Sequence, residues 1–279
     1  MSSTTRHAMP DDLAIESFRR KVYDHSAKHG RDFPWRHTDD PYCILVSEVM
    51  LQQTQTGRVS GKYREFVQRF PDVCALARAS ISDVLSTWQG LGYNRRALSL
   101  HRTAGIICGS FSGLVPREKE ALIALPGIGP YTAAAICTFA FGIPHAFIET
   151  NIRTVFINEF FPKVESVQDR DILRIVETTL DRTAPRRWYE ALMDYGAMLK
   201  ASGNPSRRSA HHRHQSAFKG SRREARGMIL RALLGEGPQS MDVLKSLIPQ
   251  WDDRFDEALR ALRQDGLIVE KDSVLAVTP

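Results

Sequence analysis

The sequence predicts an all-α fold that ends in a small winged-helix-like module. Two observations support this prediction: apolar residues recur at helical spacing through most of residues 11–180, and the pattern changes beyond residue 221. With 279 residues, of which 42% are hydrophobic, the chain can fill one large core or two modest ones.

Helical spacing predicts most elements of the main body. Residues 119–124 are helical in pattern, and Thr132 begins an apolar run that predicts another helix, so this part forms a helix–hairpin–helix unit. The segments with helical spacing are 11–28, 44–56, 62–70, 81–88, 95–108, 132–141, 151–160 and 169–180.

The hairpin between these helices reads Leu-Pro-Gly-Ile-Gly-Pro-Tyr-Thr at residues 125–132. Its glycines, Gly127 and Gly129, can adopt positive φ and let a partner's backbone come close. A Gly-x-Gly turn that opens a helix directs unpaired N–H groups and the positive end of the dipole outward, where a phosphate can bind. We therefore expect Gly127, Gly129 and Thr132 to contact a nucleic-acid backbone, although Gly-x-Gly alone fits a plain helix–helix turn as well.

The C-terminal region, residues 222–279, predicts the winged-helix-like module. A short hairpin that turns at Asp272 and Ser273 closes three helices. Such modules bind DNA through their third helix in some proteins and serve as packing or protein-contact domains in others, and both uses stay open here. The amphipathic segments are 222–235, 239–248 and 252–264. The arginines of the third are Arg254, Arg260 and Arg263.

The net charge of +6 and the pI near 9.2 favour a polyanionic partner. The sequence has no run of 18 apolar residues and no charged-plus-apolar leader, and residues 1–12 have the composition of a loose polar tail. We therefore expect no membrane association and a cytoplasmic location, at the nucleoid if the cell is bacterial.

The four cysteines are scattered along the chain. Their spacings of 29 to 34 residues lack the clustering of an iron–sulfur or zinc site, so we expect small buried thiols. They are Cys43, Cys74, Cys108 and Cys137.

Separated blocks of the chain follow one family pattern. Besides the hairpin, residues 33–55 contain Phe-Pro-Trp-Arg-His-Thr-Asp-Asp-Pro-Tyr and Ser-Glu-Val-Met-Leu-Gln-Gln-Thr-Gln, residues 88–96 read Trp-Gln-Gly-Leu-Gly-Tyr-Asn-Arg-Arg, and residues 149–153 read Glu-Thr-Asn-Ile-Arg. From about Phe33 to Met198 the chain resembles the helix-hairpin-helix DNA glycosylases of the endonuclease III superfamily, most closely the MutY-type adenine glycosylases. The resemblance implies two helical lobes with the active cleft between them.

This resemblance also suggests the domain boundaries. The glycosylase domain should span 13–199, with its hairpin near 119–140. The flanking parts are a disordered tail at 1–12, a basic loop or linker at 200–221 and the winged-helix-like module at 222–279.

Close relatives hold an iron–sulfur cluster whose ligands begin just after a Gly-Ala-Met-x segment, present here at residues 196–199. The four ligand places then fall on Lys200, Arg207, Ala210 and Ser216, none of which binds iron. We therefore expect no cluster, no metal and no other cofactor.

A basic stretch stands where the cluster loop would be. We expect it to contact phosphates through Arg207, Arg208 and Arg213. A solvated linker is one alternative, and a zinc site is another. The histidines such a zinc site would use are His211, His212 and His214.

The resemblance assigns the chemistry to two carboxylates, because cleaving an N-glycosidic bond requires protonating the base and stabilising an oxocarbenium-like sugar. Glu48 lies in an apolar stretch that favours the protonated carboxyl of a general acid. Glu149 stands where the family has an essential aspartate, and its extra methylene shifts the charge. Asn151 matches the asparagine that orders the water. A surface position for Glu48 and a helix-capping role for Glu149 are the alternatives.

Tyr131 occupies the place where bifunctional relatives carry a Schiff-base lysine. Tyrosine has no amine, so we expect base removal without efficient AP lyase activity. Gln53 and Tyr93 match residues that fill the gap and wedge the stack when a base is flipped out, with Gln52 beside them, although each also suits packing.

These observations predict a monofunctional, metal-free DNA glycosylase of base excision repair. It should act as a monomer on double-stranded DNA with a mispaired or damaged base, and be directed at adenine. No trace of a domain that recognises 8-oxoguanine is visible in the sequence. The alternatives are a thymine or uracil glycosylase acting on mispairs with guanine, since residues 31–38 also resemble those enzymes, and a non-catalytic binder of abasic or distorted DNA.

Overall fold

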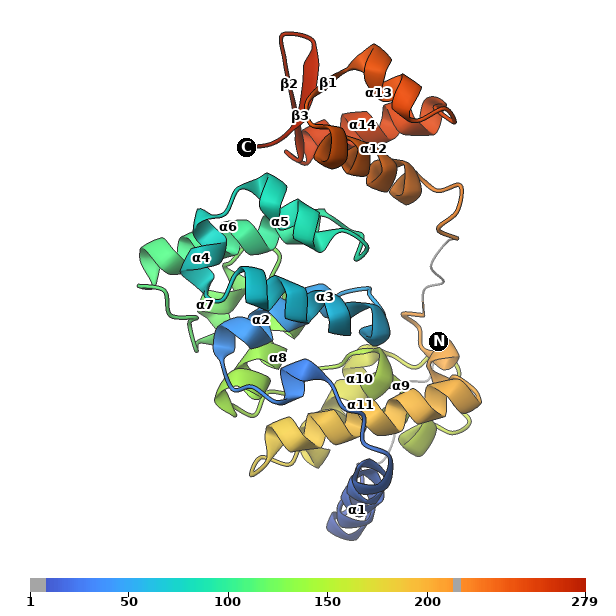
Figure 1. Ribbon diagram of the computed structural model, residues 1–279. Coiled ribbons are helices and arrows are strands. Elements are labelled where there is room, and N and C mark those ends of the chain that lie inside the picture. The colour runs from blue at the N-terminus through green and yellow to red at the C-terminus, as the bar shows by residue number, and fades with distance from the viewer. Residues whose placement is uncertain (1–8, 213–216) are drawn as a thin grey trace. The chain divides into compact units, whose positions relative to one another are not determined.

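The computed structural model describes residues 9–212 and 217–279, which are mainly helical with one small sheet (Figure 1). The all-α prediction is therefore confirmed. The chain divides into two compact units. Unit 1 contains Met1–Pro41, Arg117–Glu120 and Gly129–His214, and unit 2 contains Tyr42–Pro116, Ala121–Ile128 and Gln215–Pro279. Among the described residues, no helix combines the length and apolar character needed to cross a bilayer.

Unit 1 is built around an aromatic core. Phe18 lies edge-on to both Phe156 and Trp188, with ring centroids 5.5 and 5.6 Å apart. Its described elements are α1 (Asp12–His29), η1 (Pro34–Arg36), α8 (Pro130–Phe141), α9 (Thr150–Phe160), α10 (Asp169–Thr179), α11 (Pro185–Ser202) and η2 (Pro205–Arg208). Helix α11 packs against α9, α1 and α8.

The helical body of unit 2 uses side-chain caps to start its short helices. Asp72 accepts a hydrogen bond from the Ala75 N–H at 2.7 Å, and Ser80 accepts one from the Asp83 N–H at 3.0 Å. The helices are α2 (Pro41–Leu51), α3 (Thr56–Arg69), α4 (Val73–Arg78), α5 (Ile81–Trp88) and α6 (Arg95–Ser110). The short α7 (Lys119–Ile123) contains the point at which the chain passes from unit 1 to unit 2.

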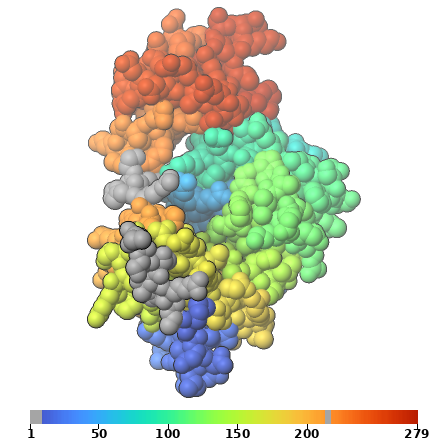
Figure 2. Space-filling view, turned by 180° about the vertical axis from the view of Figure 1, so that it is seen from behind, coloured from blue at the N-terminus to red at the C-terminus, as the bar shows by residue number. Residues whose placement is uncertain are grey.

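The C-terminal module forms a continuous orange-to-red body in Figure 2. Its antiparallel sheet has the strand order β1-β3-β2. Asp272 and Ser273 have φ of 52° and 62°, which suits the tight turn expected there. The elements are α12 (Arg222–Glu236), β1 (Gln239–Ser240), α13 (Met241–Leu247), α14 (Asp253–Gln264), β2 (Ile268–Lys271) and β3 (Val274–Val277).

The prediction of small buried thiols is wrong for two of the four cysteines. Cys74 on α4 and Cys108 on α6 form a disulfide, with Cα atoms 5.4 Å apart. Both helices pack against each other, although 34 residues separate the cysteines in sequence. The prediction is confirmed for Cys43 and Cys137, which are free and buried.

Candidate active site and nucleic-acid contacts

Helix α2 carries Glu48 through the interior of unit 2. Nine consecutive residues, from Tyr42 to Met50, are buried. Glu48 is 6% exposed, so the surface position considered from the sequence is wrong. This buried setting on α2 is the apolar environment that the sequence predicted for the proposed general acid.

Glu149 in unit 1 caps the N-terminus of α9. Its Oε1 accepts hydrogen bonds from the N–H groups of Asn151 at 2.7 Å and Ile152 at 2.9 Å. Its Oε2 accepts from the Asn151 side-chain amide at 3.3 Å. The longer glutamate side chain therefore folds back onto its own helix and keeps Asn151 beside it. Capping and catalysis are compatible here, because the cap uses mainly one of the two oxygens.

The charge environment of Glu149 combines opposing effects. Burial raises the pKa of Glu149, while the two backbone N–H groups and the cations Lys200 and Arg153 act to lower it. The net effect is a pKa above its ordinary value. The carboxylate therefore exchanges its proton closer to neutrality than a surface glutamate does.

Glycine at position 196 lets α11 approach the start of α9. A Cβ on Gly196 would overlap the main chain of Asn151, so only glycine allows this contact. Lys200 follows one turn later on the same face of α11, which explains why its charge acts on Glu149. A residue at a cluster-ligand place thus contributes to the electrostatics of the predicted catalytic carboxylate.

Tyr131 lies in the first turn of α8 and belongs to an aromatic group in unit 1. Its ring meets Phe147 edge-on at 5.5 Å, and Phe147 stacks on Tyr189 at 3.9 Å. The Tyr189 hydroxyl donates to the His145 carbonyl at 2.9 Å and accepts from the Phe147 N–H at 3.2 Å. These contacts define the position of Tyr131, whose side chain is a phenol and not an amine.

The hairpin glycines differ in conformation. Gly127 has φ of 78°, and a Cβ there would lie 2.7 Å from Ser99 Cβ, so glycine is required on both grounds. Gly129 has φ of −86° and caps α8, with open space where a Cβ would be. Thr132 is buried, so a partner at this turn would meet its main chain rather than its side chain. The open main chain at Gly129 suits a backbone-to-phosphate contact.

Gln52, Gln53 and Tyr93 lie in unit 2. Gln53 and Tyr93 have φ of 56° and 49°, a region that residues other than glycine rarely adopt and that is enriched at functional sites. The Gln52 amide donates to the Gly127 carbonyl at 3.3 Å, which joins this group to the hairpin. Gln52, which adjoins the predicted base-flipping residue Gln53, thus contacts the Gly127 end of the hairpin.

Arg96 holds this group in place and is a residue that the sequence patterns did not single out. Its guanidinium donates to the carbonyls of Val49 and Met50 at 2.8 Å each and of Gln52 at 2.6 Å, at the end of α2. It also donates to the Gly92 carbonyl at 3.0 Å. Burial lowers the pKa of Arg96 to about 10. The carbonyls left unpaired by the end of α2 are the signal that could have pointed to such a donor.

The basic stretch of unit 1 has mixed roles. The guanidinium of Arg208 donates to the carbonyls of Phe161, Val164 and Ile157, at and after the end of α9. It is therefore a helix-capping group, and Arg207 is the exposed neighbour suited to a phosphate. Arg213 lies outside the described residues.

The residues present do not fit an iron–sulfur cluster. Two cysteines are bonded to each other, and the other two are buried on α2 and α8. Across residues 9–212 and 217–279, no group of three or more His, Cys, Asp or Glu side chains is arranged around a metal position. His214 and Ser216 lie outside the described residues.

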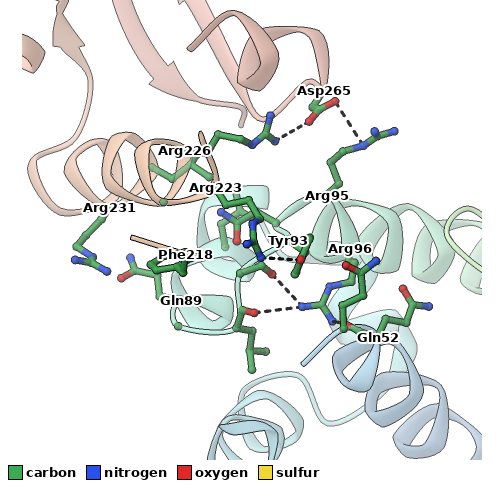
Figure 3. A pocket seen from close by; sticks show the side chains of 18 of the residues that line it. Gln52, Gln89, Tyr93, Arg95, Arg96, Phe218, Arg223, Arg226, Arg231 and Asp265 are labelled. Carbon is green, nitrogen blue, oxygen red and sulfur yellow. Dashed lines mark hydrogen bonds and ion pairs between the residues drawn. The ribbon is translucent and has the colours of Figure 1, made fainter. Parts of the chain in front are cut away.

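Unit 2 also contains a pocket of about 1040 Å³ that the sequence patterns did not indicate (Figure 3). Gln52, Gln53 and Tyr93 line it together with α12 of the C-terminal module. The Tyr93 hydroxyl accepts a hydrogen bond from Arg223 at 2.9 Å. The module therefore reaches one of the predicted base-flipping residues directly.

Comparison with known proteins places these features in context. Residues 46–195, more than half of the chain, match the HhH-GPD superfamily base excision DNA repair proteins. The adenine DNA glycosylase of Mycolicibacterium smegmatis is 34% identical over 269 residues, covering 88% of this chain and 89% of the relative. The thymine/uracil-DNA glycosylase of Methanothermobacter thermautotrophicus is 32% identical over 178 residues, covering 63% of this chain and 80% of the relative.

Solved structures show the same architecture. A thermostable thymine-DNA glycosylase aligns with a TM-score of 0.60 at 28% identity, covering 67% of this chain and 88% of that one. A trapped endonuclease III–DNA covalent intermediate aligns with a TM-score of 0.54 at 17% identity, covering 75% of this chain and 92% of that one. The second likeness concerns the fold alone.

Proposed function

This chain belongs to the HhH-GPD superfamily of base excision DNA repair proteins, and we propose that it is a monofunctional DNA glycosylase directed at mispaired adenine. The observation that carries the proposal is the carboxylate of Glu149, held at the start of α9 with Asn151 beside it. A relative named adenine DNA glycosylase that matches most of both chains supports the choice of base.

Hydrolysis of an N-glycosidic bond needs a proton for the leaving base, stabilisation of an oxocarbenium-like sugar, and water. We assign the proton to Glu48, because it lies in the buried segment of α2. Glu149 supplies the negative charge that faces the developing cation, through the oxygen that the cap uses least. Asn151 orders the attacking water from the same turn. Two carboxylates in unlike environments thereby divide acid and charge-stabilising roles.

The proposed reaction stops at base removal. Lyase chemistry needs an amine that forms an imine with the sugar, and Tyr131 has only a phenol. The DNA strand should therefore stay intact until alkali is added. Borohydride should trap no covalent protein–DNA adduct with the wild-type enzyme.

The proposed enzyme works without a metal or other cofactor. The positions at which relatives place cluster ligands carry Lys200 and Arg207 among others, and Lys200 acts on the charge of Glu149 instead. Iron and zinc analysis of the purified protein should therefore show neither metal at stoichiometric level. Exhaustive treatment with a chelator should leave its melting temperature unchanged.

A second candidate within the class removes thymine or uracil mispaired with guanine. It is favoured by the likeness to a thymine/uracil-DNA glycosylase and to a thermostable thymine-DNA glycosylase. Tyr131 is compatible with either base, so only the substrate can decide.

The deciding experiment is a panel of duplexes, each with one mispair or lesion, treated with hot alkali to reveal abasic sites. We expect cleavage at adenine mispaired with guanine, and strongly reduced cleavage with Glu149→Gln. Cleavage at thymine or uracil opposite guanine would establish the second candidate. Tight binding to abasic duplex without release of any base would instead identify a non-catalytic binder and refute the enzyme.

A further inference from the structure

The arginine-lined pocket of unit 2 is built from two parts of the chain. Arg58 of α3 and Arg95 and Arg96 of α6 line it from the helical body, and Arg222, Arg223, Arg226 and Arg231 of α12 line it from the C-terminal module. We propose that this pocket binds the phosphate backbone of the DNA duplex, and that the module holds DNA through α12 rather than through its third helix, α14. The inference rests on the proposed function in one respect, the identity of the polyanion as DNA.

The charge of the pocket is strongly unbalanced. Asp265 is the one carboxylate among its lining residues, and it is shared by Arg226 at 2.6 Å and Arg95 at 3.5 Å (Figure 3). Within the described parts of the chain, Arg58 and Arg231 are exposed and have no side-chain hydrogen bond or ion pair. Clustered cations of this kind repel one another and attract a polyanion.

The size and lining of the pocket suit a nucleic-acid strand better than a small anion. A volume of about 1040 Å³ lies at the upper limit for small-molecule sites, which are roughly 300–1,000 Å³. Phe218 lines the pocket with 59% of its surface exposed. Basic side chains combined with an exposed aromatic ring are typical of surfaces that follow a nucleic-acid backbone and stack on a base.

The pocket is also continuous with the predicted base-flipping residues. Gln53 and Tyr93 belong to its lining, and Arg223 both donates to the Tyr93 hydroxyl and lies over its ring at 5.6 Å. A backbone held by α12 would therefore lie next to the residues that we expect to enter the base stack. This position favours the substrate duplex over an unrelated polyanion.

Helix α14 is a weaker candidate, although a winged helix often uses this element. Two of its three arginines are compensated by nearby acids: Arg254 pairs with Asp252 at 2.6 Å, and Arg263 pairs with Glu270. The helix itself also carries Asp253, Asp256 and Glu257. By contrast, α12 carries four arginines and two glutamates. Arg222 pairs with Glu257 at 3.7 Å and Arg226 with Asp265 at 2.6 Å. The side chains of α12 therefore carry a net charge of +2, while the three arginines and three acids of α14 cancel.

The test compares two matched double variants of the full-length protein. Arg222→Gln with Arg231→Gln removes two charges from the pocket, and Arg254→Gln with Arg260→Gln removes two from α14. Binding to a duplex that carries a non-cleavable abasic analogue is measured by fluorescence anisotropy over a range of salt concentrations. The α12 variant should flatten the dependence of log K on log salt by about two units, roughly 0.9 for each phosphate that is no longer neutralised. The α14 variant should keep the wild-type slope.

Further measurements make the result decisive. Arg222→Lys with Arg231→Lys retains the charge and should keep the slope, while thermal melting shows that every variant is folded. The proposal would be overturned if the α12 variant kept the wild-type slope of log K against log salt, or if the α14 variant lost as much of this slope as the α12 variant. The proposal would also be overturned if inorganic pyrophosphate competed as strongly as DNA at the same concentration of phosphate groups, because the pocket would then be a small-anion site.

The binding test does not depend on catalysis. If the protein releases no base from any duplex, the proposed function fails while the slope measurement still decides the pocket. If base release occurs but the α12 variant keeps the wild-type slope, the pocket proposal fails while the proposed function stands. The two hypotheses therefore fail separately.

Discussion

Glu149 combines a structural role with a proposed catalytic one, and substitutions can separate them. Glu149→Gln keeps an oxygen that can accept the two N–H groups of α9 but removes the charge, so the fold should persist while base release falls about 10²–10³-fold. Glu149→Asp should also be slower, because the 2.7 and 2.9 Å cap bonds fit the longer side chain. Single-turnover assays at saturating enzyme measure both.

The matched variant is Glu48→Gln, which removes the proposed proton donor and should cost about 10²–10⁴ in rate. Full activity in Glu149→Gln would show that the catalytic carboxylate lies elsewhere. A Glu149→Asp enzyme faster than the wild type would show that the site is a weakened version of an aspartate site rather than one built around glutamate.

The pH dependence follows from the raised pKa of Glu149. Burial raises the pKa of Glu149 above the ordinary glutamate value of about 4.3. The carboxylate must be ionised to stabilise a cation, so activity should fall as the pH drops through this raised pKa. Lys200 opposes the rise, and Lys200→Met should therefore move this acid limb to still higher pH. Single-turnover rates measured between about pH 4 and 8 give the pH at which the rate falls on the acid side of the profile.

Lys163 provides the control, since it is exposed and is not among the main groups that shift the pKa of Glu149. Lys163→Met removes the same charge from the protein and should leave the acid limb where it is. An unmoved limb in Lys200→Met would mean that another group controls the rate at low pH.

For single residues, the sequence predicted some side-chain environments and missed others. The burial of Glu48 could be predicted because apolar residues flank it on both sides. The roles of Arg96 and Arg208 could not, because their partners are main-chain carbonyls distant in sequence, which carry no side-chain signature. Glu149 as a cap was considered, and the hydrogen bonds confirm it.

Among the elements, α11 depends on a buried ion-pair network. Asp194 is 2% exposed and accepts from Arg31 at 2.7 Å and from both terminal nitrogens of Arg36 at 2.9 Å. Burial alone would raise the pKa of Asp194, but Arg36 and Arg31 hold it below the ordinary range. The network ties α11 to the segment that follows α1.

Removing this carboxylate charge should destabilise the protein. Asp194→Asn leaves two guanidinium groups without their counter-charge, so the free energy of unfolding should fall by on the order of 3 kcal/mol at pH 7. Because the folded pKa is depressed, the wild type keeps this contribution above the unfolded pKa and loses it as pH falls through the folded value. Urea titrations should therefore show that the difference in free energy of unfolding between the wild type and Asp194→Asn is smaller near pH 3 than at pH 7.

The matched surface variant is Asp32→Asn, whose carboxylate is 83% exposed and pairs with an exposed histidine. It should change the free energy of unfolding by less than about 0.5 kcal/mol. Equal effects of the two variants would mean that the Asp194 network contributes no more than a surface pair.

The missed elements share physical reasons. Helix α11 was not predicted from hydrophobic periodicity, because its buried face includes Asp194 and Gly196. One is charged and the other weakens helices, at positions where the pattern requires apolar residues. The helix α4 has six residues and β1 has two, too short to establish a period. Long, regularly patterned helices such as α1 and α6 were predicted close to their observed ends.

For the whole molecule, the fold class and the family could be predicted, because helical periodicity and several separated motifs agree. The assignment of segments to units was harder to foresee. Unit 2 takes in residues from the body, the hairpin and the C-terminal module, so it is discontinuous in sequence. Periodicity describes local structure and contains no information on such long-range grouping.

The disulfide between α4 and α6 is the covalent link in this discontinuous unit. A bridge across 34 residues restricts the unfolded chain and typically stabilises a protein by about 2–4 kcal/mol. Adding a reductant should therefore lower the melting temperature by roughly 5–15 °C in differential scanning calorimetry. The double variant Cys74→Ser with Cys108→Ser should melt near the temperature of the reduced wild type, and the reductant should not change its melting temperature.

The free thiols Cys43 and Cys137 are buried, so substituting one of them should not abolish the effect of the reductant on the melting temperature. A wild type that melts at the same temperature with and without reductant, while thiol titration shows two cysteines released, would show that the bridge does not stabilise the fold.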